Sequence, residues 1–120
     1  MKYMILLYGD PAHEPAYDTP AFDRMMAEFA IVSERLSADG VLVAGEGLQA
    51  AETATTLRIR DGKVVTMDGP FAETKEHLGG YYVIDVPDID AALRYAALMP
   101  PAQWGSVEVR PLMVYDPAAG

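Results

Sequence analysis

The chain has 120 residues and a mass of 13.0 kDa, which suits one domain with a single hydrophobic core. Its composition, 51% hydrophobic and 22% charged, is typical of a globular protein and excludes disorder as the main state. A formal net charge of -9 argues against direct binding to nucleic acid, because displacing counterions from phosphates needs a basic face.

Residues 2–8 form the first predicted strand, because they are rich in tyrosine and aliphatic side chains and stop at Gly9, Asp10 and Pro11. That stop comes too early for an export signal or a membrane-spanning segment. The chain also has no cysteine, and hence no disulfide framework, no thiolate nucleophile and no thiolate metal site. We therefore expect a cytoplasmic protein without membrane contact.

A long helix is expected after a proline-rich loop at residues 11–19. Thr19 is a suitable N-cap, Pro20 suits the first turn, and Gly40 follows the predicted helix end near Ala38. The apolar residues of this segment repeat at helical spacing, which predicts one buried stripe. They are Phe22, Met25, Met26, Phe29, Val32 and Leu36.

The middle of the chain predicts a short strand followed by a hairpin. Residues 41–44 form the short strand, which leads into Gly45-Glu46-Gly47. Residues 53–60 and 63–67 alternate in the manner of strands, and Asp61-Gly62 between them is typical of a two-residue hairpin turn.

Residues 68–80 combine turn residues, charges of both signs and a histidine between two strand-like segments. Loops held by a rigid scaffold often carry binding and catalytic residues, so this run is the first candidate for a functional site. A second interpretation stays open, in which its glycines and proline only turn the chain.

The last third of the chain predicts a strand at residues 81–86, a helix from Asp88 to about Met99, and a strand at residues 106–115. Pro100-Pro101 stops the helix. The residues expected to face inward from this helix are Leu93, Ala96 and Ala97.

This order of elements predicts one α+β domain over residues 1–120, a ferredoxin-like βαββαβ unit with an inserted β-hairpin. An antiparallel sheet with both helices on one face should be polar on the other. Residues 2–8 and 81–84 are instead apolar or aromatic on both faces. Either the hairpin or a second subunit must cover the second face, and we favour a homodimer that packs sheet against sheet.

The segment DGPFAETKEHLGGYYVID, residues 68–85, resembles the signature of the DGPF-motif branch of the YCII-related family. The resemblance extends over nearly the whole chain. It includes MKYMILLYGD at residues 1–10, residues 40–48, residues 58–63 and SVEVRPL at residues 106–112. On these motifs the chain is identified as a member of that family.

The resemblance implies a dimeric α+β barrel, in which two ferredoxin-like units pack sheet against sheet and each has a pocket between its sheet and helices. It implies no defined reaction, because proteins that share this barrel differ in chemistry. Some relatives are thought to use a histidine at the start of the first helix together with an aspartate. The first helix expected here, residues 20–38, has no histidine, and His13 lies in the preceding loop. That pair therefore cannot be carried over.

Asp68 and His77 are a candidate catalytic pair inside the signature. A carboxylate that contacts a histidine orients the ring and raises its basicity, which suits acid–base chemistry. Alternatively, Asp68 is a turn or cap residue and His77 is solvated. If residues 70–78 were helical, Glu73 and His77 would share a face, but two ligands are too few for a metal site. We expect neither a metal nor a cofactor.

Further residues are candidates for ligand binding, as aromatic walls or as charged contacts. They are Tyr8, Glu46, Phe71, Lys75, Tyr82 and Arg110. Other interpretations stay open for several of them. The tyrosines also suit a core or a dimer interface, Glu46 a simple bend, and Arg110 a pair with Glu108 on the same face. Arg58 and Arg60 share a face of the predicted hairpin, where they either clamp an anion or are solvated.

Two functional hypotheses follow. The first is a cofactor-independent enzyme that acts on a small molecule through Asp68 and His77. The second is a non-catalytic ligand-binding or regulatory module, because the resemblance implies association with extracytoplasmic-function sigma factors. Whether the protein is an enzyme stays open.

Overall fold

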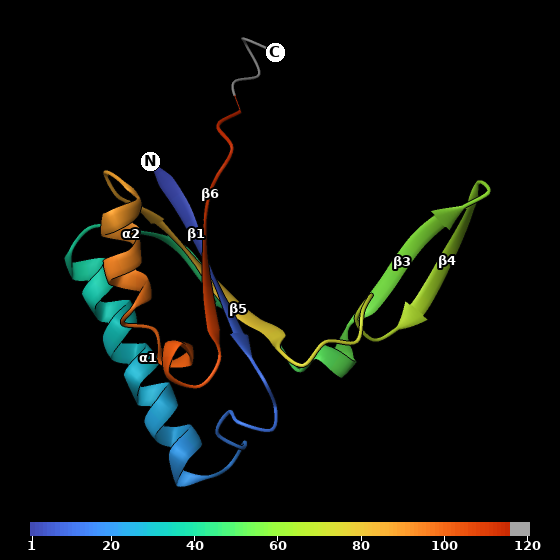
Figure 1. Cartoon of the computed structure of the whole chain (residues 1–120), viewed down its shortest axis with the longest axis horizontal. Coiled ribbons are helices and arrows are strands. Elements are labelled where there is room, and N and C mark those ends of the chain that lie inside the picture. The colour runs from blue at the N-terminus through green and yellow to red at the C-terminus, as the bar shows by residue number, and fades with distance from the viewer. Residues whose placement is uncertain (116–120) are drawn as a thin grey trace.

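Four strands form one antiparallel sheet in the order β2-β5-β1-β6, and two helices cover one face of it (Figure 1). The computed structural model describes residues 1–115. The arrangement confirms the predicted ferredoxin-like α+β fold. The elements of this layer are β1 (Lys2–Gly9), α1 (Pro20–Ala38), β2 (Leu42–Gly47), β5 (His77–Asp85), α2 (Ile89–Ala96) and β6 (Ser106–Pro111).

Each helix begins at a polar cap, as the sequence predicts. The hydroxyl of Thr19 accepts a hydrogen bond from the backbone N–H of Phe22 at 3.2 Å, and Pro20 occupies the first turn of α1. The carboxylate of Asp88 accepts from the backbone N–H of Ala91 at 2.9 Å and starts α2. These caps satisfy backbone donors that the first helical turn leaves without partners.

The core lies between the helices and one face of the sheet. Along β1, Tyr3, Ile5 and Leu7 point toward the helices, because successive side chains of a strand alternate between faces. Ile5, Leu36, Ile84 and Met99 are fully buried there.

The face of helix α2 that packs on this core differs from the face that the sequence predicts. Ala91, Ala92 and Ala96 are buried, whereas Leu93 is half exposed and Ala97 is exposed. Small alanine side chains let the helix lie close to the sheet, and the bulkier leucine is turned toward solvent. The expectation that Leu93 and Ala97 face inward is therefore wrong.

The second face of the sheet, here called the open face, is covered by neither helix (Figure 1). The strand register places Met4, Leu6 and Tyr8 of β1 on it, beside Tyr81 and Val83 of β5. Val83 is buried but lies outside the core cluster. An apolar sheet surface that no element of its own chain covers is typical of a contact surface.

The inserted hairpin consists of β3 (Thr55–Arg60) and β4 (Lys63–Asp68) and extends away from the sheet (Figure 1). Asp61 and Gly62 form its turn with φ of 52° and 74°, as a type I′ hairpin turn requires. The backbone N–H of Gly69 donates to the carbonyl of Ala54 at 2.7 Å and closes the hairpin base. The hairpin therefore forms as predicted, and it does not cover the open face of its own sheet.

Three strand boundaries differ from the sequence prediction by three residues or more. β5 begins at His77 instead of Tyr81, because the signature residues already pair with the end of β1. β2 continues to Gly47, since its glycines lie against β5. β6 ends at Pro111 instead of Tyr115, where proline has no N–H to donate to a strand ladder.

Candidate functional site

A cavity of about 530 Å³, here called the loop cavity, lies where β1 ends and β5 begins. Its wall combines Tyr8 at the end of β1, the 3₁₀ turn η1 (Ala51–Thr53), and residues of the signature between Pro70 and Leu78. The volume lies within the roughly 300 to 1,000 Å³ that is usual for small-molecule sites. Three of the predicted site residues line it together, namely Tyr8, Phe71 and His77.

A β-bulge in β5 shapes this end of the sheet. Leu7 pairs with Gly80 and Tyr8 with Leu78, so Gly79 is the extra residue. The carbonyl of Gly79 accepts a hydrogen bond from the backbone N–H of Leu48 at 2.9 Å. This bond ties the segment after β2 to the start of β5, and Leu48 thereby becomes part of the cavity wall.

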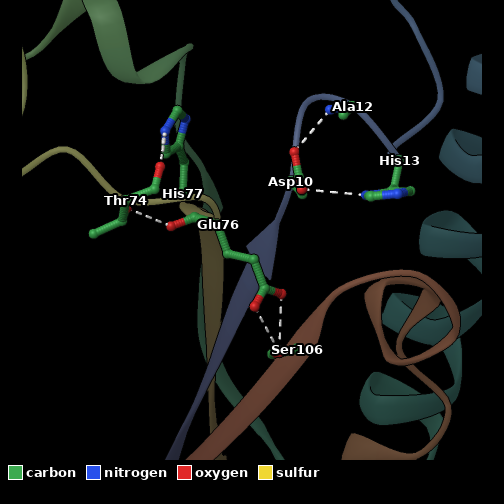
Figure 2. Close-up of polar contacts among 7 residues, drawn as sticks. All are labelled: Asp10, Ala12, His13, Thr74, Glu76, His77 and Ser106. Carbon is green, nitrogen blue, oxygen red and sulfur yellow. Dashed lines mark hydrogen bonds and ion pairs between the residues drawn. The ribbon is translucent and has the colours of Figure 1, made fainter.

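His77 is oriented by the backbone of its own loop (Figure 2). Its Nε2 lies 3.0 Å from the carbonyl oxygen of Thr74. Because a carbonyl oxygen only accepts, this contact requires the proton on Nε2. In the neutral ring, Nδ1 then carries a lone pair, and the structure gives it no hydrogen-bond partner among residues 1–115. The ring can therefore accept a hydrogen bond from a molecule in the cavity.

The other signature contacts hold the loop against the sheet. Thr74 donates from its hydroxyl to the carbonyl of Glu76 at 2.7 Å, which closes a short turn. The carboxylate of Glu76 accepts from the hydroxyl of Ser106 at 2.9 and 3.1 Å, past the end of β1 (Figure 2). Residues 70–76 form no helix, so the helical placement of Glu73 beside His77 does not occur.

Tyr8 is part of a chain of hydrogen bonds that runs from the cavity onto β6. Its hydroxyl donates to Glu108 Oε1 at 3.2 Å, and Arg110 Nη2 donates to Glu108 Oε2 at 2.6 Å. Burial, and then the hydrogen bond and charge of Glu108, raise the pKa of Tyr8. The hydrogen bond from Arg110 lowers the pKa of Glu108. Tyr8 therefore stays a neutral phenol, and Arg110 pairs with Glu108 as the shared-face interpretation predicted.

A histidine–carboxylate contact also forms outside the cavity, between His13 and Asp10 (Figure 2). His13 Nδ1 lies 3.2 Å from Asp10 Oδ2, and the backbone N–H of Ala12 donates to Asp10 Oδ1 at 2.9 Å. The Ala12 hydrogen bond, followed by the contact with His13 and the charge of Lys75, lowers the pKa of Asp10. The His13 ring is mostly exposed, so Asp10 is primarily a turn residue.

Asp68 and His77 are not joined by a hydrogen bond or an ion pair in the part of the chain that the structure describes. Asp68 ends β4 opposite Thr55, exposed at the hairpin base, whereas His77 starts β5 opposite Gly9. The catalytic pairing of these two residues stays a prediction.

A second cavity, the helix cavity, has a volume of about 610 Å³ and lies between α1 and the other face of the same sheet end. It contains the predicted residues Glu46 and Tyr82, together with Ser33, which the sequence analysis did not single out. The hydroxyls of Ser33 and Tyr82 lie 2.7 Å apart and form a hydrogen bond between α1 and β5. The predicted ligand-binding residues are thus divided between two cavities, while Lys75 and Arg110 line neither.

Sequence reasoning missed three polar contacts, those of Asp10 with His13, Glu76 with Ser106 and Ser33 with Tyr82. The spacing of Asp10 and His13 after a strand end is a recognisable turn pattern, and could have indicated their contact. Glu76 and Ser106 are 30 residues apart, so only the strand register reveals that they meet.

Among residues 1–115, no group of three or more His, Asp or Glu side chains is arranged to hold a metal ion. No helix in this part of the chain is both long enough and apolar enough to cross a membrane.

Comparison with known proteins identifies the family of this chain. The family model described as the YCII-related domain matches residues 1–116. A protein of Rhizobium meliloti (strain 1021), described as "Uncharacterized protein R00369", is 39% identical over 119 residues, which cover 98% of this chain and 96% of that protein. The chain therefore belongs to the YCII-related family.

Proposed function

We propose that this protein, as a member of the DGPF branch, is a homodimeric binding module for a small, flat and largely apolar molecule. One observation carries the proposal, namely that the signature loop and Tyr8 together form a cavity of ligand size. Phe71 is 74% exposed and offers an aromatic wall. His77 Nδ1 accepts from a donor group of the ligand.

Two ionisable groups of the loop cavity, Tyr8 and Glu76, favour binding over catalysis. Acid–base catalysts usually have pKa values shifted toward the working pH. The shift at Tyr8 is upward from a value that is already high, so this phenol donates hydrogen bonds instead of taking protons. Glu76 is held by Ser106 and has a structural role. This arrangement suits recognition of a ligand by shape and a few polar contacts.

The experiment is equilibrium binding of an aromatic probe that carries one sulfonate group, 1-anilinonaphthalene-8-sulfonate, followed by its fluorescence. Ala72→Trp fills the loop cavity, and we expect it to weaken probe binding about tenfold or more. Ala30→Trp fills the helix cavity and serves as the matched control. If only Ala30→Trp weakened binding, or if the folded protein bound no probe, the assignment to the loop cavity would be wrong.

The homodimer is proposed on the open face, where apolar side chains of β1 and β5 have no cover from their own helices. Packing the same face of a second copy against it gives an isologous interface, in which each copy uses the same residues. Sedimentation at micromolar concentration should give about twice the 13.0 kDa chain mass. A species of one chain mass would contradict the dimer.

A second candidate function is a cofactor-independent enzyme that uses Asp68 and His77. The observation that favours it is the place of His77 in the cavity wall with Nδ1 available. If Asp68 approaches the ring when a ligand binds, Asp68→Asn should move the ring resonances of His77 in NMR spectra of the probe-bound protein. Asp61→Asn, at the hairpin tip, is the control. Unchanged His77 resonances in Asp68→Asn would argue against the pair.

The regulatory role implied by the family resemblance is a further part of this proposal. An acidic chain suits contact with a basic protein better than contact with DNA, and an extracytoplasmic-function sigma factor is the partner expected from the resemblance. Co-purification of the two proteins in the presence and absence of probe would test whether ligand binding is coupled to this contact.

A further inference from the structure

The β3–β4 hairpin exposes an unusual number of aliphatic side chains for a surface element. The strand register places Leu57, Ile59 and Val64 on one face, here called the apolar face of the hairpin. Their exposed fractions are 58%, 61% and 63%. Neither strand packs extensively on any other helix or strand in the described residues.

A two-stranded ribbon of this kind is only marginally stable in water unless another element packs on it. The described chain supplies no such element. The radius of gyration is 16.7 Å, against about 14 Å for a compact chain of this length. The extended hairpin contributes to this excess, and its apolar face is left for another molecule to cover.

Charge distinguishes the hairpin from the rest of the chain. Residues 55–68 contain three basic and two acidic residues, whereas the remaining positions contain six basic and sixteen acidic residues. Arg58, Arg60 and Lys63 lie together on the face opposite the apolar one. A basic arm on an acidic body is complementary to another copy of the same body.

We propose that the β3–β4 hairpin is an arm that packs on the second copy of this chain in the proposed homodimer. The arm projects on the side of the sheet away from the helices, which is the side of the open face (Figure 1). A copy that packs on the open face therefore lies next to the arm, and two-fold symmetry gives each copy the arm of the other. The apolar face of the arm is then buried, and its basic face meets the acidic surface of the partner.

This inference rests on the proposed homodimer, and its test separates the two. Ile59→Ser and Val64→Ser together remove most of the apolar face. We expect them to raise the dimer dissociation constant about tenfold or more in sedimentation equilibrium. Ile31→Ser is the matched control, because Ile31 lies on α1 with a similar exposed fraction of 66%.

A second variant tests the contact between the basic face of the arm and the acidic surface of the partner. Arg58→Glu with Arg60→Glu should weaken the dimer and reduce the dependence of its dissociation constant on salt. Arg24→Glu on α1 is the control for a general change in net charge. The hairpin residues are exposed, so these changes leave the core of each subunit intact.

A photo-crosslinking amino acid at position 59 identifies the occupant directly. We expect a covalent product of about twice 13.0 kDa, with the crosslinked peptide in the other copy. The same amino acid at position 31 should give little product. A wild-type monomer would overturn both proposals. A dimer whose dissociation constant is unaffected by the arm variants, and whose position 59 forms no intermolecular crosslink, would overturn the arm and leave the sheet-face dimer standing.

Discussion

Two adjacent glycines in the signature differ in how much space they have. A Cβ on Gly80 would lie 2.9 Å from the backbone carbonyl oxygen of Glu46 in the neighbouring strand, and this backbone atom cannot easily move. A Cβ on Gly79 would meet nothing closer than the carbonyl oxygen of Leu7 at 3.8 Å. Neither residue has positive φ, so the requirement for glycine at position 80 comes from the close approach of β2 and β5.

Gly80→Ala should therefore destabilise the fold by about 1–3 kcal/mol, because the added methyl group forces two strands apart. Gly79→Ala should be nearly neutral or slightly stabilising, since it removes chain freedom from the unfolded state. Urea unfolding of both variants measures the difference. Equal stabilities would show that the strands separate without cost at this position.

Tyr8 gives a prediction at alkaline pH. Its pKa is raised above the ordinary value of about 10, so its contribution to stability is complete below that pH and is lost as the pH rises through the folded-state pKa. Tyr8→Phe should make the unfolding free energy less dependent on pH above about 10. Tyr95→Phe is a comparison, because the pKa of Tyr95 is also raised, chiefly by its hydrogen bond to Asp39. Parallel alkaline curves for Tyr8→Phe and wild type would contradict the assignment.

At the scale of elements, Asp39 links the two helices. Its carboxylate accepts a hydrogen bond from the Tyr95 hydroxyl of α2 at 2.7 Å and from Arg35 Nε of α1 at 2.9 Å. The same two hydrogen bonds, that of Tyr95 first, lower the pKa of Asp39. The contact lies where α1 ends, so a single carboxylate joins Arg35 of α1 to Tyr95 of α2.

Asp39→Asn should lower stability at neutral pH. A lowered pKa contributes stability above the unfolded-state value of about 4, and this contribution is lost as the pH falls through the folded-state pKa. The variant should accordingly show a flatter decrease of unfolding free energy on acidification below about pH 4. Glu34→Gln, an exposed change on α1, is the control, and the acid limb of its stability curve should match that of wild type.

The order and type of the elements could be predicted from the sequence, because caps, turn residues and apolar spacing are local properties. Thr19 and Asp88 mark both helix starts, and Asp61-Gly62 marks the hairpin turn. Which face of α2 is buried could not be predicted, because this depends on how closely its alanines let the helix approach the sheet. The start of β5 at His77 depends on pairing with β1, which is 68 or more residues earlier in the chain.

The candidate site was harder to predict, because it too depends on how distant segments of the chain pair. The signature identified Phe71 and His77, and these do lie in one cavity with Tyr8. Tyr82 was grouped with them, although it lies on the helix side of the sheet and lines the helix cavity. Glu46 also lines that cavity, although it pairs with Tyr81 of the open face. Residue type indicated which side chains suit a ligand, but the side of the sheet on which each one lies follows from register and from the bulge at Gly79.

At the scale of the whole molecule, Leu6 is the most direct test of the proposed dimer. It lies on the open face of the central strand, directly opposite Glu108 on β6. Leu6→Lys places a positive charge beside that carboxylate, so the subunit should stay folded. The charge would be buried between two sheets, and the dimer should weaken about a hundredfold or more. Light scattering measures the mass, with circular dichroism as the check on folding.

Leu93→Lys is the matched control, because Leu93 is 50% exposed on α2, on the helix side of the sheet. We expect it to leave the dimer intact. Dissociation of both variants to the same degree would place the interface elsewhere, whereas dissociation of Leu6→Lys alone would support the open face.

The position of β1 in the sheet has a consequence for biosynthesis. β1 is made before the other strands of the sheet, yet its two neighbours come from residues 77–85 and 106–111. The central strand therefore cannot complete its hydrogen bonds until β6 has left the ribosome. Contacts between such distant segments form slowly, and an apolar strand that waits for them is exposed to aggregation. Nascent chains that stop before residue 106 should consequently depend on chaperones to remain in solution.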